Sequence, residues 1–339
     1  MIARSERGSA SPPPRKHLAD RATELAVIER LRSTISSVLD PYVRPGLPYA
    51  FLDFPNHDNI GDSAIWLGSL AYFRARALRA PEYLCTFDYP DFDELERRCP
   101  EGPIFLHGGG NFGDIWPWYQ TFRQSVMARF PGRQIVQLPQ TLHFEHPETL
   151  AAAAHAIERH GNFVMLVRDR RSYEIATSAF ACTVVLCPDM AFCLGPLRPT
   201  RPAQHDLLLL LRRDRESTQR VPLHDLALTG SVLRADWPAE SRTFRPAMKV
   251  RSAVGALAHG MRWYDPLVLR EHLYDRLADA RVRRGLDLLS SGRYVIADRL
   301  HAHILALLLG IPHHVLDNSY GKLDAFIDAW TSEITTVER

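Results

Sequence analysis

Short apolar runs alternate with longer amphipathic segments through the first half of this chain. The runs cover residues 49–52, 84–87, 104–106, 135–138, 164–167 and 184–186. Each run has the length of a buried strand, and the segments between them carry apolar residues at helical spacing. This alternation predicts a parallel sheet with helices on both faces.

The segment before the first run shows the helical pattern most clearly. Apolar side chains recur there at Leu25, Ile28, Leu31, Ile35 and Leu39. Pro41 then ends the predicted helix. Residues 1–20 are instead rich in Ser, Pro and Arg and lack the apolar stretch of a signal peptide, so we expect a disordered lead there.

The second half repeats the alternation after a Pro-rich stretch at 196–202, which we interpret as a linker. Leu207–Leu211 is a run of leucines and predicts a fully buried strand. Residues 213–250 show no clear pattern. Further helices are predicted over 267–290, 298–309 and the C-terminal segment, with strands over 294–297 and 314–316. The fold class is therefore α/β, with two Rossmann-like domains, residues 21–197 and 203–339, that face a cleft.

Three consecutive glycines follow the run at 104–106. Gly108, Gly109 and Gly110 lack the Cβ atoms that would keep a ligand away from the backbone, and Asn111 and Asp114 come next. Open α/β sheets bind ligands at the C-terminal ends of their strands. We therefore expect a tight loop here, whose backbone N–H groups meet an anion or a sugar.

Two common motifs overlap with these glycines, and the sequence excludes both. The spacing matches the dinucleotide fingerprint, but no Asp or Glu occurs between Asp114 and Glu145, where the ribose would need one. His107 and the glycines also resemble the oxyanion loop of esterases, but the chain lacks the G-x-S-x-G turn that must accompany it.

A second polar loop, residues 53–62, follows the first strand. It contains Asn56, Asn59 and Asp62 directly before a helix predicted over 63–79. Asp62 or Ser63 could simply cap that helix. The loop holds more polar groups than one cap requires, which favours a binding role.

Composition restricts the class of protein further. The formal charge is only +2, with 41 basic and 39 acidic residues, so no overall field favours nucleic acid. Five cysteines without a C-x-x-C pair indicate reduced cytosolic thiols. The longest apolar stretch, Ile304–Ile311, is far shorter than the roughly 18 residues of a membrane span. We expect a cytoplasmic protein.

Several motifs occur together in one order along the chain. They are residues 56–62 (NHDNIGD), Gly108–Asn111 (GGGN), Arg168-Asp169 with Ser172, Pro188-Asp189, residues 298–301 (DRLH) and Gly321-Lys322. The set resembles the polysaccharide pyruvyl transferase family, with exopolysaccharide-type members most similar. The resemblance implies a fold similar to the GT-B glycosyltransferases and transfer of pyruvate from phosphoenolpyruvate to a sugar as a ketal.

The resemblance also implies partners. Phosphoenolpyruvate is a co-substrate, and no further cofactor is expected. The acceptor is a sugar or a lipid-linked oligosaccharide, which would bring the protein to the inner face of the membrane through peripheral association. The sequence leaves the acceptor sugar and the oligomeric state open.

Basic residues suit the two anionic groups of this donor. Arg168, Arg212 and Arg299 each follow an apolar run, and a guanidinium matches both carboxylate and phosphate. Lys322 and the N–H groups that open the helix after Arg299 could add phosphate contacts. The alternative for each arginine is a surface ion pair.

Ketal formation needs an acid that protonates the methylene carbon of the donor. His301 is our candidate, because an imidazole in the first turn of a helix would lie beside the donor. His303, His313 and His314 fit packing or surface positions better. Asp62 and Asp114 are candidate bases for the acceptor. The predicted acceptor-binding residues are Asn56, Asn59, Gly109, Gly110, Asn111, Asp114 and Gln140.

Other interpretations remain open at this point. His143, Glu145 and His146 match no common zinc spacing, so we expect no metal site. A GT-B glycosyltransferase that uses a nucleotide-sugar would share the fold. A noncatalytic glycan- or anion-binding protein would need the arginines but not the acid at His301.

Overall fold

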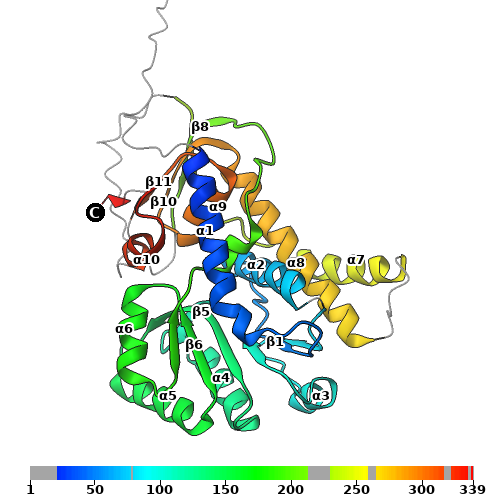
Figure 1. Cartoon of the computed structure of the whole chain (residues 1–339). Coiled ribbons are helices and arrows are strands. Elements are labelled where there is room, and N and C mark those ends of the chain that lie inside the picture. The colour runs from blue at the N-terminus through cyan, green and yellow to red at the C-terminus, as the bar shows by residue number, and fades with distance from the viewer. Residues whose placement is uncertain are drawn as a thin grey trace, which may run out of the picture.

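The computed structural model describes residues 21–77, 79–212, 230–258, 265–316, 322–334 and 337–338. Within these parts every strand belongs to one of two parallel sheets (Figure 1). The first has the order β2-β1-β3-β5-β6-β7, with β4 paired to β5, and the second has the order β12-β11-β10-β8-β9.

The strands of the first sheet are β1 (Ala50–Leu52), β2 (Tyr83–Cys85), β3 (Ile104–Leu106), β4 (Gly109–Gly113), β5 (Ile135–His143), β6 (Phe163–Val167) and β7 (Thr183–Leu186). Those of the second are β8 (His205–Leu210), β9 (Val232–Ala235), β10 (Gly292–Ala297), β11 (His313–Leu316) and β12 (Val337–Glu338). Strands β3 and β6 are buried along their whole length, because helices cover both faces of a parallel sheet. The predicted α/β class with parallel sheets is confirmed.

The helices of the first half are α1 (Arg21–Leu39), α2 (Ile60–Arg76), α3 (Phe92–Arg98), α4 (Pro117–Arg129), α5 (Pro147–His160) and α6 (Arg170–Ala179), with short 3₁₀ turns η1 (Asp40–Tyr42) and η2 (Met190–Leu194). Those of the second half are α7 (Phe244–Ala258), α8 (Pro266–Leu289), α9 (Leu300–Leu309) and α10 (Lys322–Trp330). None of the helices described here is long and apolar enough to cross a bilayer.

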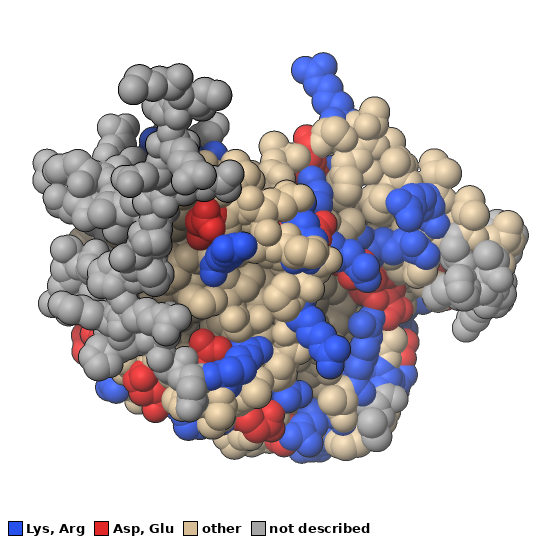
Figure 2. All heavy atoms as spheres, turned by 90° about the horizontal axis from the view of Figure 1, so that it is seen from above, with Lys and Arg blue, Asp and Glu red and all other residues tan. Residues whose placement is uncertain are grey.

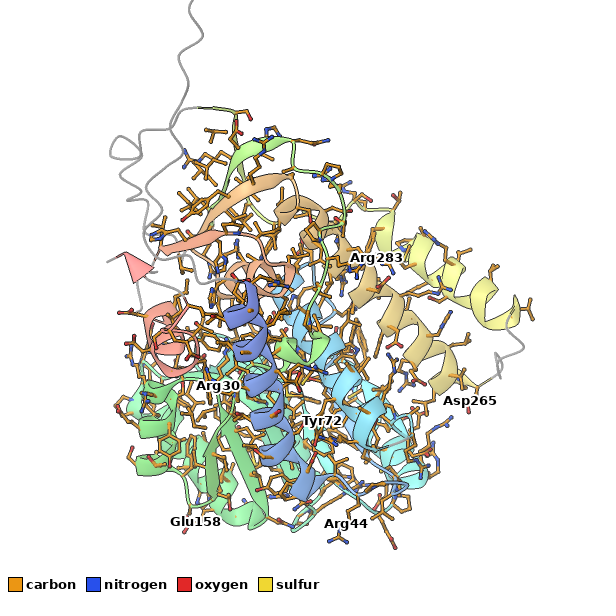
Figure 3. All side chains as sticks on the ribbon, turned by 45° about the horizontal axis from the view of Figure 1, so that its top comes forward. Arg30, Arg44, Tyr72, Glu158, Asp265 and Arg283 are labelled. Carbon is orange, nitrogen blue, oxygen red and sulfur yellow. The ribbon has the colours of Figure 1, made fainter. Side chains whose placement is uncertain are left out.

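One hydrophobic core reaches from the first sheet to the second. It contains Ile28 of α1, Trp66 of α2, Leu208 of β8 and Leu305 of α9. In Figure 1, α1 runs along both sheets, and Figure 3 shows Tyr72 of α2 turned toward it; the Tyr72 hydroxyl donates to Asp40 at 2.8 Å. The two sheets are thus fixed to one another by helices. The division into two domains about a cleft stays a prediction.

The glycine segment is a strand and not the tight loop that we expected. Gly109–Gly113 forms β4, which pairs with the far half of β5, and β5 continues to His143 instead of ending at Leu138. Gly113 has φ 131°, and a Cβ there would lie 1.7 Å from the carbonyl oxygen of His143. Only glycine permits so close an approach of two backbones.

Two further expectations need correction. Helix α2 begins at Ile60, and its N-cap is Asn59, whose Oδ1 accepts from the Gly61 N–H at 2.9 Å. The predicted cap at Asp62 or Ser63 is therefore wrong. Strand β9 and helix α7 lie in or next to the stretch that showed no pattern, of which residues 213–229 are outside the described residues.

Candidate active site

A single buried carboxylate joins the two halves of the chain. Asp189 follows β7 and is 1% exposed, and its Oδ2 lies 2.6 Å from Nη1 of Arg168 and 3.4 Å from Nε2 of His301. Arg168 comes directly after β6, whereas His301 lies in the first turn of α9, after β10. Arg168, one of the four residues predicted to bind the donor, and His301, predicted to protonate it, therefore lie on either side of one negative charge.

The surroundings of Asp189 fix this arrangement. Burial alone would raise the pKa of Asp189, but the charges of His301 and Arg168 outweigh it and hold that pKa well below its ordinary value. The Arg168 Nε also donates to the hydroxyl of Thr141 at 3.0 Å, and the Trp330 indole donates to the Arg168 carbonyl at 2.8 Å. Thr141 and Asp189 hold the guanidinium, and Trp330 holds the backbone, so the orientation of Arg168 is defined.

The start of α2 packs directly against His301. A Cβ placed on Gly61 would lie 2.2 Å from Nδ1 of the His301 ring. The next residue, Asp62, accepts from the Asn59 amide at 2.8 Å and lies 3.6 Å from Nε2 of His57. Its side chain is 23% exposed. The candidate base is thus one residue away from the helix position that touches the candidate acid.

Gly61→Ala is expected to lower turnover by about 10²-fold, because the added methyl group must displace the imidazole. Overpacking of this kind also costs about 1–3 kcal/mol of stability. Steady-state turnover and urea unfolding measure the two effects. Ser63→Ala is the matched control in the same turn, since Ser63 is fully buried and we expect wild-type turnover from it. Full activity of Gly61→Ala would show that the imidazole position is not needed.

The first residues of β4 lie between Asp62 and Arg168. A Cβ on Gly109 would be 3.4 Å from Oδ1 of Asp62, and one on Gly110 would be 3.1 Å from Nη2 of Arg168. The glycine backbone thus lies beside both charged groups, and its role in ligand binding stays a prediction. Asn56, also predicted to bind the acceptor, is exposed in the loop before α2.

Two of the four predicted acceptor amides, Asn111 and Gln140, bind each other. Gln140 is fully buried, accepts from the Asn111 N–H at 3.2 Å and donates to the Asn111 Oδ1 at 3.0 Å and to the His107 carbonyl at 3.1 Å. The buried Arg123 donates to the Asn111 carbonyl at 3.1 Å. Gln140 therefore positions Asn111 and β4 and does not itself reach the surface.

Asp114 has a structural role. Its Oδ2 accepts from the Glu145 N–H at 2.8 Å, from the His146 N–H at 2.9 Å and from the Thr149 hydroxyl at 2.9 Å, which anchors the start of α5. Burial would raise the pKa of Asp114, but these hydrogen bonds outweigh it and lower that pKa. Of the two candidate bases, the geometry favours Asp62.

Arg212 and Arg299 lie at neighbouring strand ends of the second sheet. Arg299 precedes α9 and pairs with Asp236 through Nε–Oδ1 and Nη2–Oδ2 contacts of 2.8 and 2.9 Å. The Arg212 N–H donates to Asp298 at 2.9 Å. Among the described residues, no side chain caps the N-terminus of α9, and the N–H groups at such a helix end favour an anion. Lys322 opens α10, but its side chain and residues 317–321 lie outside the described residues.

Sequence reasoning gave no role to two buried groups at this edge. Asp53 follows β1 with φ 71°, and burial raises its pKa to about 8. His107 follows β3, and burial lowers its pKa to about 3. Within the described residues, Oδ1 of Asp53 and both ring nitrogens of His107 have no hydrogen-bond partner. Each is the first polar residue after an apolar run, as Arg168 is. Selecting the first polar residue after every predicted strand would have identified both.

Known proteins resemble the chain over most of its length. The family model described as polysaccharide pyruvyl transferase matches residues 59–320. "Pyruvyl transferase 1" of Schizosaccharomyces pombe is 31% identical over 295 residues, covering 83% of this chain and 69% of the relative. "Putative pyruvyl transferase EpsO" of Bacillus subtilis is 30% identical over 302 residues, covering 88% and 90%.

A solved structure supports the fold independently. The crystal structure of an uncharacterized protein from Klebsiella pneumoniae superposes with a TM-score of 0.59 at 19% identity, covering 91% of this chain and 98% of that one. The family match includes the α2 segment, the glycines of β4, the Arg168–Asp189 pair and His301. The chain belongs to the polysaccharide pyruvyl transferase family.

Proposed function

We propose that this protein transfers pyruvate from phosphoenolpyruvate to a sugar of an exopolysaccharide, or of its lipid-linked precursor, and forms a ketal. The observation that carries the proposal is the contact of one carboxylate, Asp189, with both Arg168 and His301. An anion-binding guanidinium and a titratable imidazole beside a common buried charge suit an anionic donor that must be protonated.

The donor would bind between the two sheets' strand ends. Arg168 would pair with one of its anionic groups, and Arg299 and the N-terminus of α9 with the other. Arg212, on the strand next to Arg299, adds positive charge at the same edge. Donor carboxylate and phosphate would thus hold the methylene carbon near His301.

In the proposed reaction the donor gains one proton at its methylene carbon, and two acceptor hydroxyls add to the adjoining carbon. His301 gives a proton to the methylene carbon, which becomes the methyl group and leaves an oxocarbenium-like centre at the adjoining carbon. One acceptor hydroxyl adds to that carbon, phosphate departs, and a second hydroxyl adds to close the ketal. One hydroxyl proton passes to Asp62 and from there to solvent, the other leaves on the departing phosphate, and His301 regains a proton from solvent.

The loop before α2 and the start of β4 would form the acceptor side, next to Asp62. Asn56 and Asn59 lie in the same loop, and the β4 backbone at Gly109 and Gly110 lies beside Asp62 and Arg168. Amide side chains and open backbone groups match the hydroxyls of a sugar. Asn111, held by Gln140, borders this surface.

Incubation with phosphoenolpyruvate and candidate glycans tests the proposal. We expect release of inorganic phosphate together with a gain of one pyruvate, as a ketal, in the mass of the acceptor. Turnover of a nucleotide-sugar instead would favour a GT-B glycosyltransferase. Binding of glycan and phosphoenolpyruvate without any product would favour a noncatalytic protein.

Arg299→Ala is expected to weaken phosphoenolpyruvate binding by about 2–5 kcal/mol, because a desolvated anionic group loses its guanidinium. Arg299→Lys should restore only part of the affinity, since it keeps the charge but loses the planar fork. Calorimetry on the folded proteins measures both. Arg283→Ala is the control, because Arg283 is a 72% exposed arginine on α8 (Figure 3). Equal donor affinity in all of these proteins would assign Arg299 a purely structural role beside Asp236.

A further inference from the structure

Helix α7 has two apolar faces, and only one of them is covered. Met248 and Ser252 are buried, on the side that packs against α8. Val250, Val254 and Leu257 are 64%, 61% and 61% exposed, more than any other large aliphatic side chain in the described parts of the chain. Their spacing of four and three residues puts them in one row along the helix.

The charged side chains of α7 itself are all positive. Lys249 and Arg251 flank Val250 in sequence, and both are exposed. At 100° per residue they project on opposite borders of the row. The sequence of α7, FRPAMKVRSAVGALA, contains no Asp or Glu. Figures 1 and 3 show α7 at the periphery beside α8. On the side to which α7 extends, Figure 2 shows several Lys and Arg side chains, with Asp and Glu beside them.

This combination matches a particular kind of surface. A helix that lies in a membrane interface has an apolar row bordered by Lys and Arg, which meet anionic headgroups while the row enters the acyl boundary. A surface that binds a protein partner usually combines apolar side chains with polar groups that hydrogen-bond to the partner. The aliphatic row of α7, with Lys249 and Arg251 on its two sides, is complementary to an anionic lipid surface.

Helix α7 is also connected to the acceptor loop. Arg245 of α7 donates to Glu240 at 2.9 Å, and Glu240 pairs with Arg281 of α8. Arg281, fully buried, donates in turn to the carbonyl of Pro55 at 2.9 Å. Pro55 precedes Asn56 in the loop before α2. These contacts therefore fix the position of α7 relative to that loop, and a membrane bound by α7 would lie at a defined distance from it.

We propose that the outer row of α7, formed by Val250, Val254 and Leu257 between Lys249 and Arg251, binds an anionic phospholipid bilayer. The contact would bring the protein to a lipid-linked acceptor, and in this respect the inference rests on the proposed function. The contact itself requires no substrate. Membrane binding and catalysis can therefore be tested separately.

Vesicle sedimentation of the full chain tests the contact. We expect binding to phosphatidylcholine vesicles that contain phosphatidylglycerol, weaker binding at high salt, and little binding to pure phosphatidylcholine. The double variant Val250→Asp, Val254→Asp should bind at least about tenfold more weakly, because two aliphatic side chains no longer enter the bilayer. Lys249→Gln with Arg251→Gln should reduce the preference for phosphatidylglycerol.

Leu47→Asp is the matched control, because Leu47 is a 45% exposed aliphatic residue in the loop before β1. It should bind vesicles as the wild type does. Both Asp variants should keep wild-type turnover on a soluble acceptor. Only the α7 variant should lose turnover on an acceptor embedded in vesicles.

Three results would overturn the inference: no preference of the wild type for phosphatidylglycerol, equal vesicle binding by the α7 variant, or a wild-type dimer that the α7 variant dissociates. The last would mean that a second copy covers the row. Failure of the proposed function would look different, since turnover on every acceptor would be absent while vesicle binding persisted.

Discussion

His301→Gln is expected to lower turnover by about 10²–10⁴-fold while phosphoenolpyruvate still binds. Glutamine fills similar space and keeps a polar end toward Asp189, but it cannot deliver a proton at neutral pH. Turnover and donor affinity, measured on the same preparations, separate chemistry from binding. In deuterated solvent the wild-type protein should place deuterium in the transferred methyl group.

The pH profile gives a second test of His301. Since the acid must hold a proton, wild-type turnover should fall at alkaline pH. The variant should lack this alkaline limb. If His301→Gln kept the limb, or kept near wild-type turnover, another residue would supply the proton.

His303→Gln is the matched control two residues along the same helix. His303 is fully buried, with Nδ1 2.8 Å from Nε2 of His313 and Nε2 3.0 Å from the Thr331 hydroxyl. Burial holds the pKa of His303 well below its ordinary value. We therefore expect His303→Gln to lose stability and to keep the alkaline limb.

Asp189→Asn is expected to destabilise the protein by about 3–5 kcal/mol at pH 7. The substitution leaves the Arg168 guanidinium buried without its counter-charge, and Arg168 is only 6% exposed. It also removes the charge that faces His301, so turnover should fall together with stability. Urea unfolding followed by tryptophan fluorescence measures the free energy.

The difference between wild type and Asp189→Asn should depend on pH. Because the folded-state pKa of Asp189 is depressed, its ionisation stabilises the protein above the unfolded-state pKa of about 3.9, and this contribution is lost as pH falls below that value. The two unfolding curves should therefore converge in acid. Asp62→Asn, at a carboxylate 23% exposed, should cost only about 0–1 kcal/mol. If Asp189→Asn lowered the free energy of unfolding by a similarly small amount, Asp189 would not be the counter-charge on which the buried Arg168 depends.

Several parts of the site follow from the order of residues alone. Strand-end rules identified Arg168, Arg212 and Arg299, and His301 was found because it follows Arg299 at the start of a helix. The rules also missed residues. They gave no role to Asp53, whose positive φ of 71° and burial are not visible in a sequence.

Local patterns also misled where a distant partner decides the structure. The glycines at 109–113 read as a loop because glycine has a low strand propensity, yet pairing with β5 makes them a strand. Asp114 was a candidate base beside them, and the structure shows that its Oδ2 accepts hydrogen bonds from the start of α5, about thirty residues further along the chain.

The sequence by itself determined the α/β class, the order of most strands and helices, and the candidate donor and acid residues. It could do so because apolar periodicity and strand ends are local properties of a chain. The tertiary structure alone decided that Asp189 joins Arg168 to His301, that Gly61 touches the imidazole, and that one face of α7 stays uncovered. Those contacts depend on how α2 and α8 pack between the sheets, and no local pattern encodes the distance between two side chains from separate halves of a chain.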